Sequence, residues 1–186
     1  MKSYVDKIAN AIESVSEMTL SLYLELLFKA FNRRAQIFII GNGGSAATAS
    51  HFATDLNKIK NITGLPGRAI SLCDNSSLIT AYANDISFDS IFREQLENLA
   101  NPNDILIAIS ASGKSQNIIE AINYSKKNQI YSVGLVGFDA GDMNICDLVI
   151  HTKSDLGDYG PTEDAHSIVC HYITEELKHR LNSKYP

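Results

Sequence analysis

Apolar side chains recur at helical spacing through the first part of the chain. Between about residues 4 and 32 no proline or glycine interrupts this pattern. Residues three or four positions apart lie on one face of a helix, so the pattern predicts one long N-terminal helix. The apolar positions that define this face are Ile8, Ile12, Val15, Leu22, Leu26 and Leu27.

Five short runs rich in isoleucine, leucine and valine follow, with helical segments between them. They cover residues 36–40, 68–72, 104–109, 130–136 and 148–151. Strands that alternate with helices are typical of a parallel sheet covered on both faces. A last helix is predicted over about 162–184, because Pro161 suits a helix entrance. The sequence therefore predicts one α/β domain over residues 1–186, a three-layer α/β/α sandwich with a five-stranded parallel sheet.

The composition narrows the class of protein. The chain has 186 residues, 45% hydrophobic and 20% charged, as in a soluble globular domain. Its net charge of -5 comes without a basic stripe, which argues against a nucleic-acid-binding protein. Cys73, Cys146 and Cys170 have no CxxC spacing and are expected to be structural thiols in a reducing compartment. Without a signal core or a run of about 18 apolar residues, we expect a cytoplasmic protein.

Two loops of small residues follow the first and third predicted strands. Residues 41–46 read GNGGSA and residues 110–115 read SASGKS, and each is followed by a helical segment. Free backbone N–H groups at a helix N-terminus bind phosphate, and glycine lets the backbone approach a ligand closely. The two loops together therefore predict a phosphate-binding crevice at the carboxyl ends of the strands. The residues that supply its backbone and hydroxyl groups are Gly41, Gly43, Gly44, Ser45, Ser110, Ser112 and Ser115.

Two other phosphate-binding patterns are only partly matched. The spacing Gly41-x-Gly43-x-x-Ala46 fits a dinucleotide fingerprint, with Asp74 as its ribose acid. A dinucleotide enzyme would also need a substrate domain, for which the chain is too short. The second loop resembles the end of a P-loop, but Ala108 stands where the first glycine is required.

Four side chains could bind a divalent metal. His51 and Asp55 stand four residues apart on the helix after the first loop, so they share one face. Glu163 and His171, eight apart on the last helix with His166 between them, also lie near one face. Two imidazoles and two carboxylates form a ligand set suited to zinc or a similar ion.

These residues resemble the sedoheptulose 7-phosphate isomerases of the SIS (sugar isomerase) family, and the similarity covers nearly the whole chain. The resemblance implies an aldose–ketose isomerase that works as a homotetramer, with one zinc-like metal per subunit and sites shared between subunits. It implies metal ligation by His51, Asp55, Glu163 and His171, with His171 as proton donor and Asp55 or Glu163 as base. It also implies a role in making heptose for lipopolysaccharide or capsule. The substrate contacts implied are Asn42, Gly43, Gly44, Ser45, Asn84, Asp85, Ser110, Ala111, Ser112, Ser115 and Glu163.

The chain departs from the family pattern at several site positions. Asp55 replaces the usual glutamate, Glu163 the usual glutamine, and Ala111 a threonine. An arginine beyond the metal pair has no match, and Lys58 and Lys60 are the nearest cations. Two other functions stay open: a non-catalytic SIS protein that binds a sugar phosphate or a protein partner, and a dinucleotide-binding protein.

Overall fold

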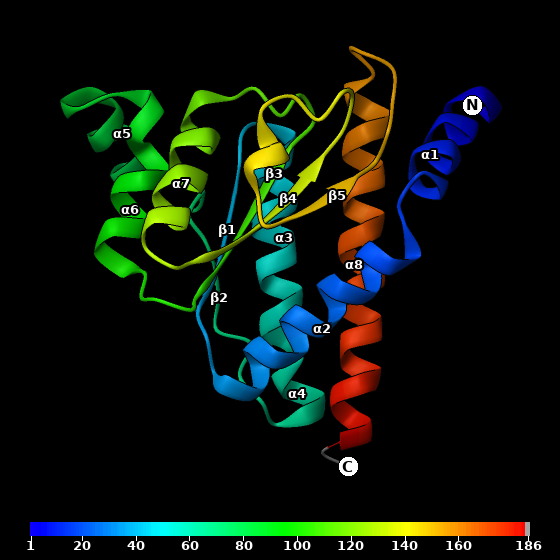
Figure 1. Ribbon diagram of the computed structural model, residues 1–186, viewed down its shortest axis with the longest axis horizontal. Helices are drawn as coiled ribbons and strands as arrows, with labels where there is room; N and C mark the ends of the chain where they lie inside the picture. Colours follow the sequence, from blue (N-terminus) through cyan, green and yellow to red (C-terminus); the bar gives the residue numbers. More distant parts are fainter. Residues whose placement is uncertain (185–186) are drawn as a thin grey trace.

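The five predicted strands form one parallel sheet in the computed structural model, which describes residues 1–184 (Figure 1). The last two residues of the predicted domain lie outside this range. The strand order is β2-β1-β3-β4-β5, and every neighbouring pair is parallel. The strands are β1 (Ile37–Gly41), β2 (Ala69–Ser71), β3 (Ile105–Ser110), β4 (Tyr131–Val136) and β5 (Leu148–His151).

Helices cover both faces of the sheet, which confirms the three-layer prediction (Figure 1). Successive residues of β1 alternate between two cores: Ile37 and Ile39 contribute to one, and Phe38 and Ile40 to the other. Because both faces are buried, β1 and β3 are continuous apolar runs. The first core includes α2 (Glu17–Arg33), α3 (Gly44–Lys58) and α8 (Tyr159–Lys184), with the short α4 (Lys60–Thr63) beside α8. The second includes α5 (Ser76–Asp85), α6 (Ile91–Leu99), α7 (Gln116–Lys127) and the 3-10 turn Met143–Ile145. A further 3-10 turn, Phe88–Ser90, contacts α5, α6 and α7.

The single long N-terminal helix expected from the apolar spacing is two helices, α1 (Lys2–Glu13) and α2. The break falls at residues 14–16. The Ser14 hydroxyl donates to the Ala11 carbonyl at 2.7 Å and accepts from the Lys153 backbone N–H at 2.8 Å. Ser16 is extended, with φ -67° and ψ 128°. Serine hydroxyls compete with the backbone hydrogen bonds of a helix. The spacing of apolar residues does not indicate this competition, so it predicted one helix.

The last helix begins at Tyr159, three residues before the predicted start. Pro161 falls in its first turn, where its missing N–H breaks no helical hydrogen bond. Helix α1 is attached to this end of α8. The Tyr4 hydroxyl donates to Asp164 at 2.7 Å, and the Lys7 ammonium pairs with Asp158 at 2.6 Å.

The cysteines have the character expected of structural thiols. All three are free, and Cys146 and Cys170 are buried. Burial raises the pKa of Cys146 to about 12 and also raises the pKa of Cys170, so both remain protonated thiols. Within residues 1–184, no helix combines the length and apolarity needed to cross a membrane.

His166 on α8 is buried without a hydrogen bond to either ring nitrogen from residues 1–184. Burial lowers its pKa from 6.5 to about 4. The nearby Val136 carbonyl opposes this lowering without reaching hydrogen-bonding geometry. The folded protein therefore resists protonation of a group that the unfolded chain protonates below pH 6.5.

We expect the free energy of unfolding to fall as pH drops from 6.5 towards 4. The difference between pKa 6.5 and about 4 corresponds to about 3 kcal/mol. This contribution is fully present above pH 6.5, because the imidazole is then neutral in both states. Urea unfolding across this range should show a shallower pH dependence for His166→Phe than for the wild type. The exposed His179→Ala is the control, and parallel profiles for the wild type and His166→Phe would contradict the prediction.

Candidate metal and substrate site

The two loops of small residues meet where the sheet changes its direction of winding. Strands β1 and β3 are neighbours, but α3 follows β1 on one face and α7 follows β3 on the other. The chain therefore diverges above these two carboxyl ends and leaves a crevice, the usual ligand position in open parallel sheets. The loop at residues 110–115 lies on one side of it and the loop at residues 41–46 on the other.

A pocket of about 150 Å³ occupies this crevice, and we call it the serine pocket. Seven of the predicted substrate-binding residues line it, so the structure brings these distant segments of the chain together. Tyr159 lines it too, and no sequence signal pointed to that residue. The full lining is Asn42, Ser45, Ile109, Ser110, Ala111, Ser112, Ser115, Tyr159 and Glu163.

Hydrogen bonds fix the shape of both loops. The side chains of Asn42 and Asn117 exchange two hydrogen bonds of 2.9 Å, which tie the first loop to the start of α7. The Gly113 N–H donates to the Ser110 hydroxyl at 3.1 Å. Gly113 has φ +66°, and a Cβ there would overlap the Ala140 carbonyl, so this position requires glycine. Asn117 was not predicted as a site residue, because its position in the sequence is that of any residue in the first turn of a helix.

Gly43 and Gly44 bring the start of α3 close to α8. Gly43 caps the helix with φ +55°, and Gly44 is its first residue. A Cβ at Gly44 would overlap the Glu163 carboxylate, so the absence of a side chain lets that carboxylate lie against the first turn of α3. Negative charge is favoured there by the helix dipole.

Three of the four predicted metal ligands come together between α3 and α8. The His51 and His171 Nε2 atoms are 3.0 Å apart, and the Asp55 Oδ2 lies 3.3 Å from His51 Nε2 and 3.7 Å from His171 Nε2. We call these three side chains the His–Asp–His cluster. Glu163, expected as the fourth ligand, is not among this group, whose ligand atoms all lie within 4.8 Å of one another. It lines the serine pocket instead.

The spacing of the cluster suits a tetrahedral metal. Ligand atoms about 2.0–2.1 Å from a zinc ion lie roughly 3.3–3.4 Å from each other, and the three observed distances span this value. The imidazoles meet edge to face at 85° and are more than half exposed, at 60% and 55%. The cluster is therefore open to a ligand from outside.

Asn84 and Asp85 are not brought to the serine pocket of their own chain. They are exposed at the end of α5, where the Asn84 amide donates to the Asp85 carboxylate at 2.8 Å. Asp74, the ribose acid of the dinucleotide alternative, accepts a hydrogen bond from the Ser50 hydroxyl on α3.

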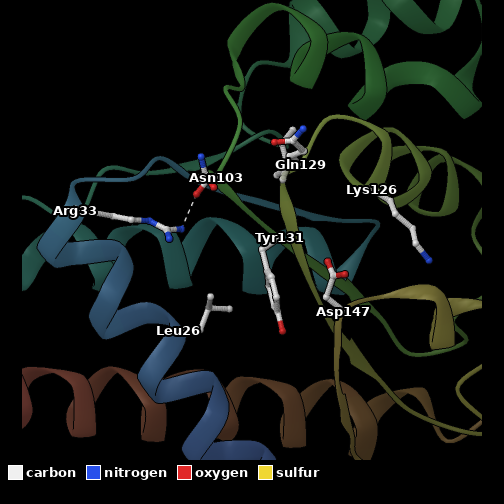
Figure 2. Close-up of a pocket in the computed structure, with 8 residues that line it drawn as sticks. Leu26, Arg33, Asn103, Lys126, Gln129, Tyr131 and Asp147 are labelled. Carbon is white, nitrogen blue, oxygen red and sulfur yellow. Dashed lines mark hydrogen bonds between the residues drawn. The ribbon is translucent and has the colours of Figure 1, made fainter.

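A second pocket, of about 230 Å³, lies at the opposite edge of the sheet (Figure 2). Asn103, Gln129 and Tyr131 place it at the amino ends of β3 and β4, away from both small-residue loops. None of the predicted site residues lines it. Its remaining lining residues are Leu26, Arg33, Lys126, Ile130 and Asp147.

Comparisons with known proteins agree on one family. The family model described as SIS domain matches residues 3–137. The phosphoheptose isomerase of Geobacter sulfurreducens is 33% identical over 178 residues, which cover 94% of this chain and 92% of that protein. The phosphoheptose isomerase of Helicobacter pylori is 32% identical, with 98% and 94% covered. The solved phosphoheptose isomerase of Neisseria gonorrhoeae superposes with a TM-score of 0.85 at 26% identity, covering 96% of both chains.

Proposed function

Because this chain belongs to the SIS domain family and has phosphoheptose isomerases as relatives, it is a sugar-phosphate isomerase, and we propose sedoheptulose 7-phosphate as its substrate. The product would be glycero-manno-heptose 7-phosphate, a precursor of lipopolysaccharide or capsule heptose, formed in the cytoplasm. One observation carries the proposal: the serine pocket and the His–Asp–His cluster lie along the same pair of helices, α3 and α8. A sugar phosphate has an anion at one end and a carbonyl at the other, and these two features suit its two ends.

In this proposal the phosphate binds in the serine pocket. The hydroxyls of Ser110, Ser112 and Ser115 and the backbone at the start of α3 supply donors there. Binding energy from this end then positions the reacting end.

His51, Asp55 and His171 would hold a divalent metal, with zinc as our choice, because their ligand atoms have the separations such an ion requires. A bound ion of this kind supplies Lewis acidity towards sugar oxygens. Isomerisation also needs a base to take the proton from C1 and an acid to assist at the oxygen. His171 is the proposed acid, and Asp55 and Glu163 are the two candidates for the base.

The test is turnover on a panel of ketose phosphates, including five-, six- and seven-carbon members. We expect aldose phosphate to form from the seven-carbon substrate in a metal-dependent reaction. Saturable binding without turnover, by protein that holds no metal, would instead indicate a non-catalytic sugar-phosphate-binding protein.

We also propose that the working unit is a homotetramer. Large apolar side chains are exposed on α2 and α8, among them Met18 at 73%, Leu22 at 55% and Tyr172 at 48%. Tyr172 also lines a groove of about 460 Å³ at the junction of α1, α2 and α8. A second copy of the chain that covers this face would remove the apolar area from water.

Sharing of sites between subunits predicts complementation. Asp85 lies away from its own serine pocket, so we expect it to complete the site of a neighbouring subunit. Asp85→Ala and His171→Ala chains should each be inactive, whereas unfolding and refolding them together should restore roughly a quarter of the wild-type activity. Light scattering should give four times the chain mass of 20.4 kDa. An active monomer, or no activity from the mixture, would exclude the shared site.

A further inference from the structure

Tyr159 lines the serine pocket but belongs to none of the motifs that predicted this pocket. We infer that Tyr159 is a substrate-binding residue whose phenolic hydroxyl donates a hydrogen bond to the phosphate of the sugar. The inference rests on the proposed function and deepens it, because it adds a side chain of α8 to the serines and backbone groups at the phosphate end.

The Tyr159 hydroxyl is available to a ligand. The side chain is 54% exposed, and the hydroxyl has no hydrogen bond to any of residues 1–184. The hydroxyl of Tyr4, which lies beside the same end of α8, instead donates to Asp164. Because no lysine or arginine of the described chain lines the serine pocket, neutral donors have to hold an anion there. A phenol supplies one such donor.

Phe138, in the segment after β4, holds the Tyr159 ring in place. The two rings meet edge to face, with centroids 5.1 Å apart and 82° between their planes. This is a favourable arrangement of two aromatic rings. Phe138 is only 6% exposed and has φ +41°. A bulky residue in the left-handed region is strained, and strain of this kind occurs preferentially at functional sites.

Hydrogen bonds keep Phe138 in this conformation. Its N–H donates to the Ser154 hydroxyl at 3.2 Å, and its carbonyl oxygen lies 2.9 Å from His151 Nε2 on β5. The same Ser154 hydroxyl is 2.6 Å from the Thr162 hydroxyl. Thr162 belongs to the first turn of α8, which also carries Tyr159. The segment after β4 is therefore tied to the part of α8 that presents the tyrosine.

Tyr159 lies at the phosphate end of the proposed site. It shares the lining of the pocket with Ser110, Ser112 and Ser115, and about three turns of α8 separate it from His171. A hydroxyl in this position does not reach C1 and C2 when these carbons lie at the His–Asp–His cluster. Loss of the hydroxyl should therefore weaken the ground state and the transition state equally, which raises KM and leaves kcat unchanged.

Tyr159→Phe removes the hydroxyl and keeps the ring. Because a hydrogen bond to a charged group changes affinity by about 10-fold or more, we expect KM for sedoheptulose 7-phosphate to rise by about 10-fold. The kcat and the metal content per chain should equal those of the wild type. The Kd of inorganic phosphate, measured by calorimetry, should rise by a similar factor. Tyr131→Phe is the matched control, because Tyr131 is 39% exposed at the opposite edge of the sheet, and it should behave as the wild type.

Phe138→Leu tests whether Phe138 acts through Tyr159. In the wild-type background the loss of the edge-to-face contact should raise KM. In the Tyr159→Phe background the same change should add little, because the hydroxyl that Phe138 positions is already absent. An equal rise of KM in both backgrounds would show that Phe138 does not act through this hydroxyl.

Several results would overturn the inference about Tyr159. One is a Tyr159→Phe protein with the wild-type KM and the wild-type Kd for phosphate, and another is a wild-type protein that does not bind inorganic phosphate. A raised KM with an unchanged Kd for phosphate would place the hydroxyl against a sugar oxygen, and a lower kcat at unchanged KM would place it at the reacting carbons. If the wild type isomerises no sugar phosphate, the proposed function fails, and the two Kd values for phosphate still decide the role of Tyr159.

Discussion

Replacing His171 by alanine is expected to remove the bound metal and nearly all isomerase activity. His171 supplies one of the three nitrogen and oxygen atoms of the His–Asp–His cluster, and His51 and Asp55, both on α3, would then have no partner from α8. Loss of an acid catalyst alone lowers turnover by about 10²–10⁴-fold, and loss of the metal adds to this. Elemental analysis of protein purified without chelators and initial rates on the proposed heptose substrate measure the two effects.

His179→Ala provides the matched control for that prediction. It removes an imidazole from the same helix, eight residues further on, where the side chain is exposed and outside the cluster. It should retain both metal and activity. The assignment of the ligands would be contradicted by a wild-type protein without bound metal, or by a His171→Ala protein that binds as much metal per chain as the wild type.

Removing a hydroxyl from the serine pocket is expected to weaken substrate binding strongly. Ser112→Ala or Ser115→Ala each delete a hydroxyl from the pocket proposed to hold the phosphate. A hydrogen bond to a charged group contributes about 1.5–3 kcal/mol, so KM should rise by roughly 10- to 140-fold. Among the described residues no lysine or arginine lines this pocket, so no cation from its lining would compensate for the lost donor.

Steady-state kinetics of the two serine variants test this, with Ser183→Ala as the control. The Ser183 hydroxyl donates to the His179 carbonyl at the exposed end of α8 and should not affect KM. A metal content equal to the wild type would show that the variants affect only the anion end of the site. An unchanged KM in both pocket variants would show that the phosphate binds elsewhere.

Much of the fold could be predicted from the sequence because its signals are local. Buried parallel strands are continuous apolar runs, and the small residues after β1 and β3 mark the loops at their carboxyl ends. The pairing of His51 with Asp55 follows from the helical repeat alone. The same rule does not indicate the break at residues 14–16, which depends on a hydrogen bond from Lys153, far along the chain.

The predictions that relied on two helices meeting were less complete. Which residue of α8 faces which residue of α3 depends on how far one helix is shifted along its axis relative to the other. The sequence of neither helix determines that shift by itself. His171 lies opposite His51 as expected, but Glu163 lies about two turns nearer the serine pocket. Asn84 and Asp85, also expected at the substrate site, are instead exposed at the end of α5.

Helix α8 fixes the distance between the two ends of the proposed site. The pocket end, at Tyr159, and the cluster end, at His171, belong to one uninterrupted helix, so no loop movement or side-chain rotation can change the backbone distance between them. A substrate held at both ends must match that length. In the proposed site, selection between sugar phosphates of different carbon number would therefore be set by the rigid rise of a helix. A single inserted residue would also rotate one end of the site by about 100°, so only a change of about one full turn, about 5.4 Å, would alter the length and keep both ends on the same face.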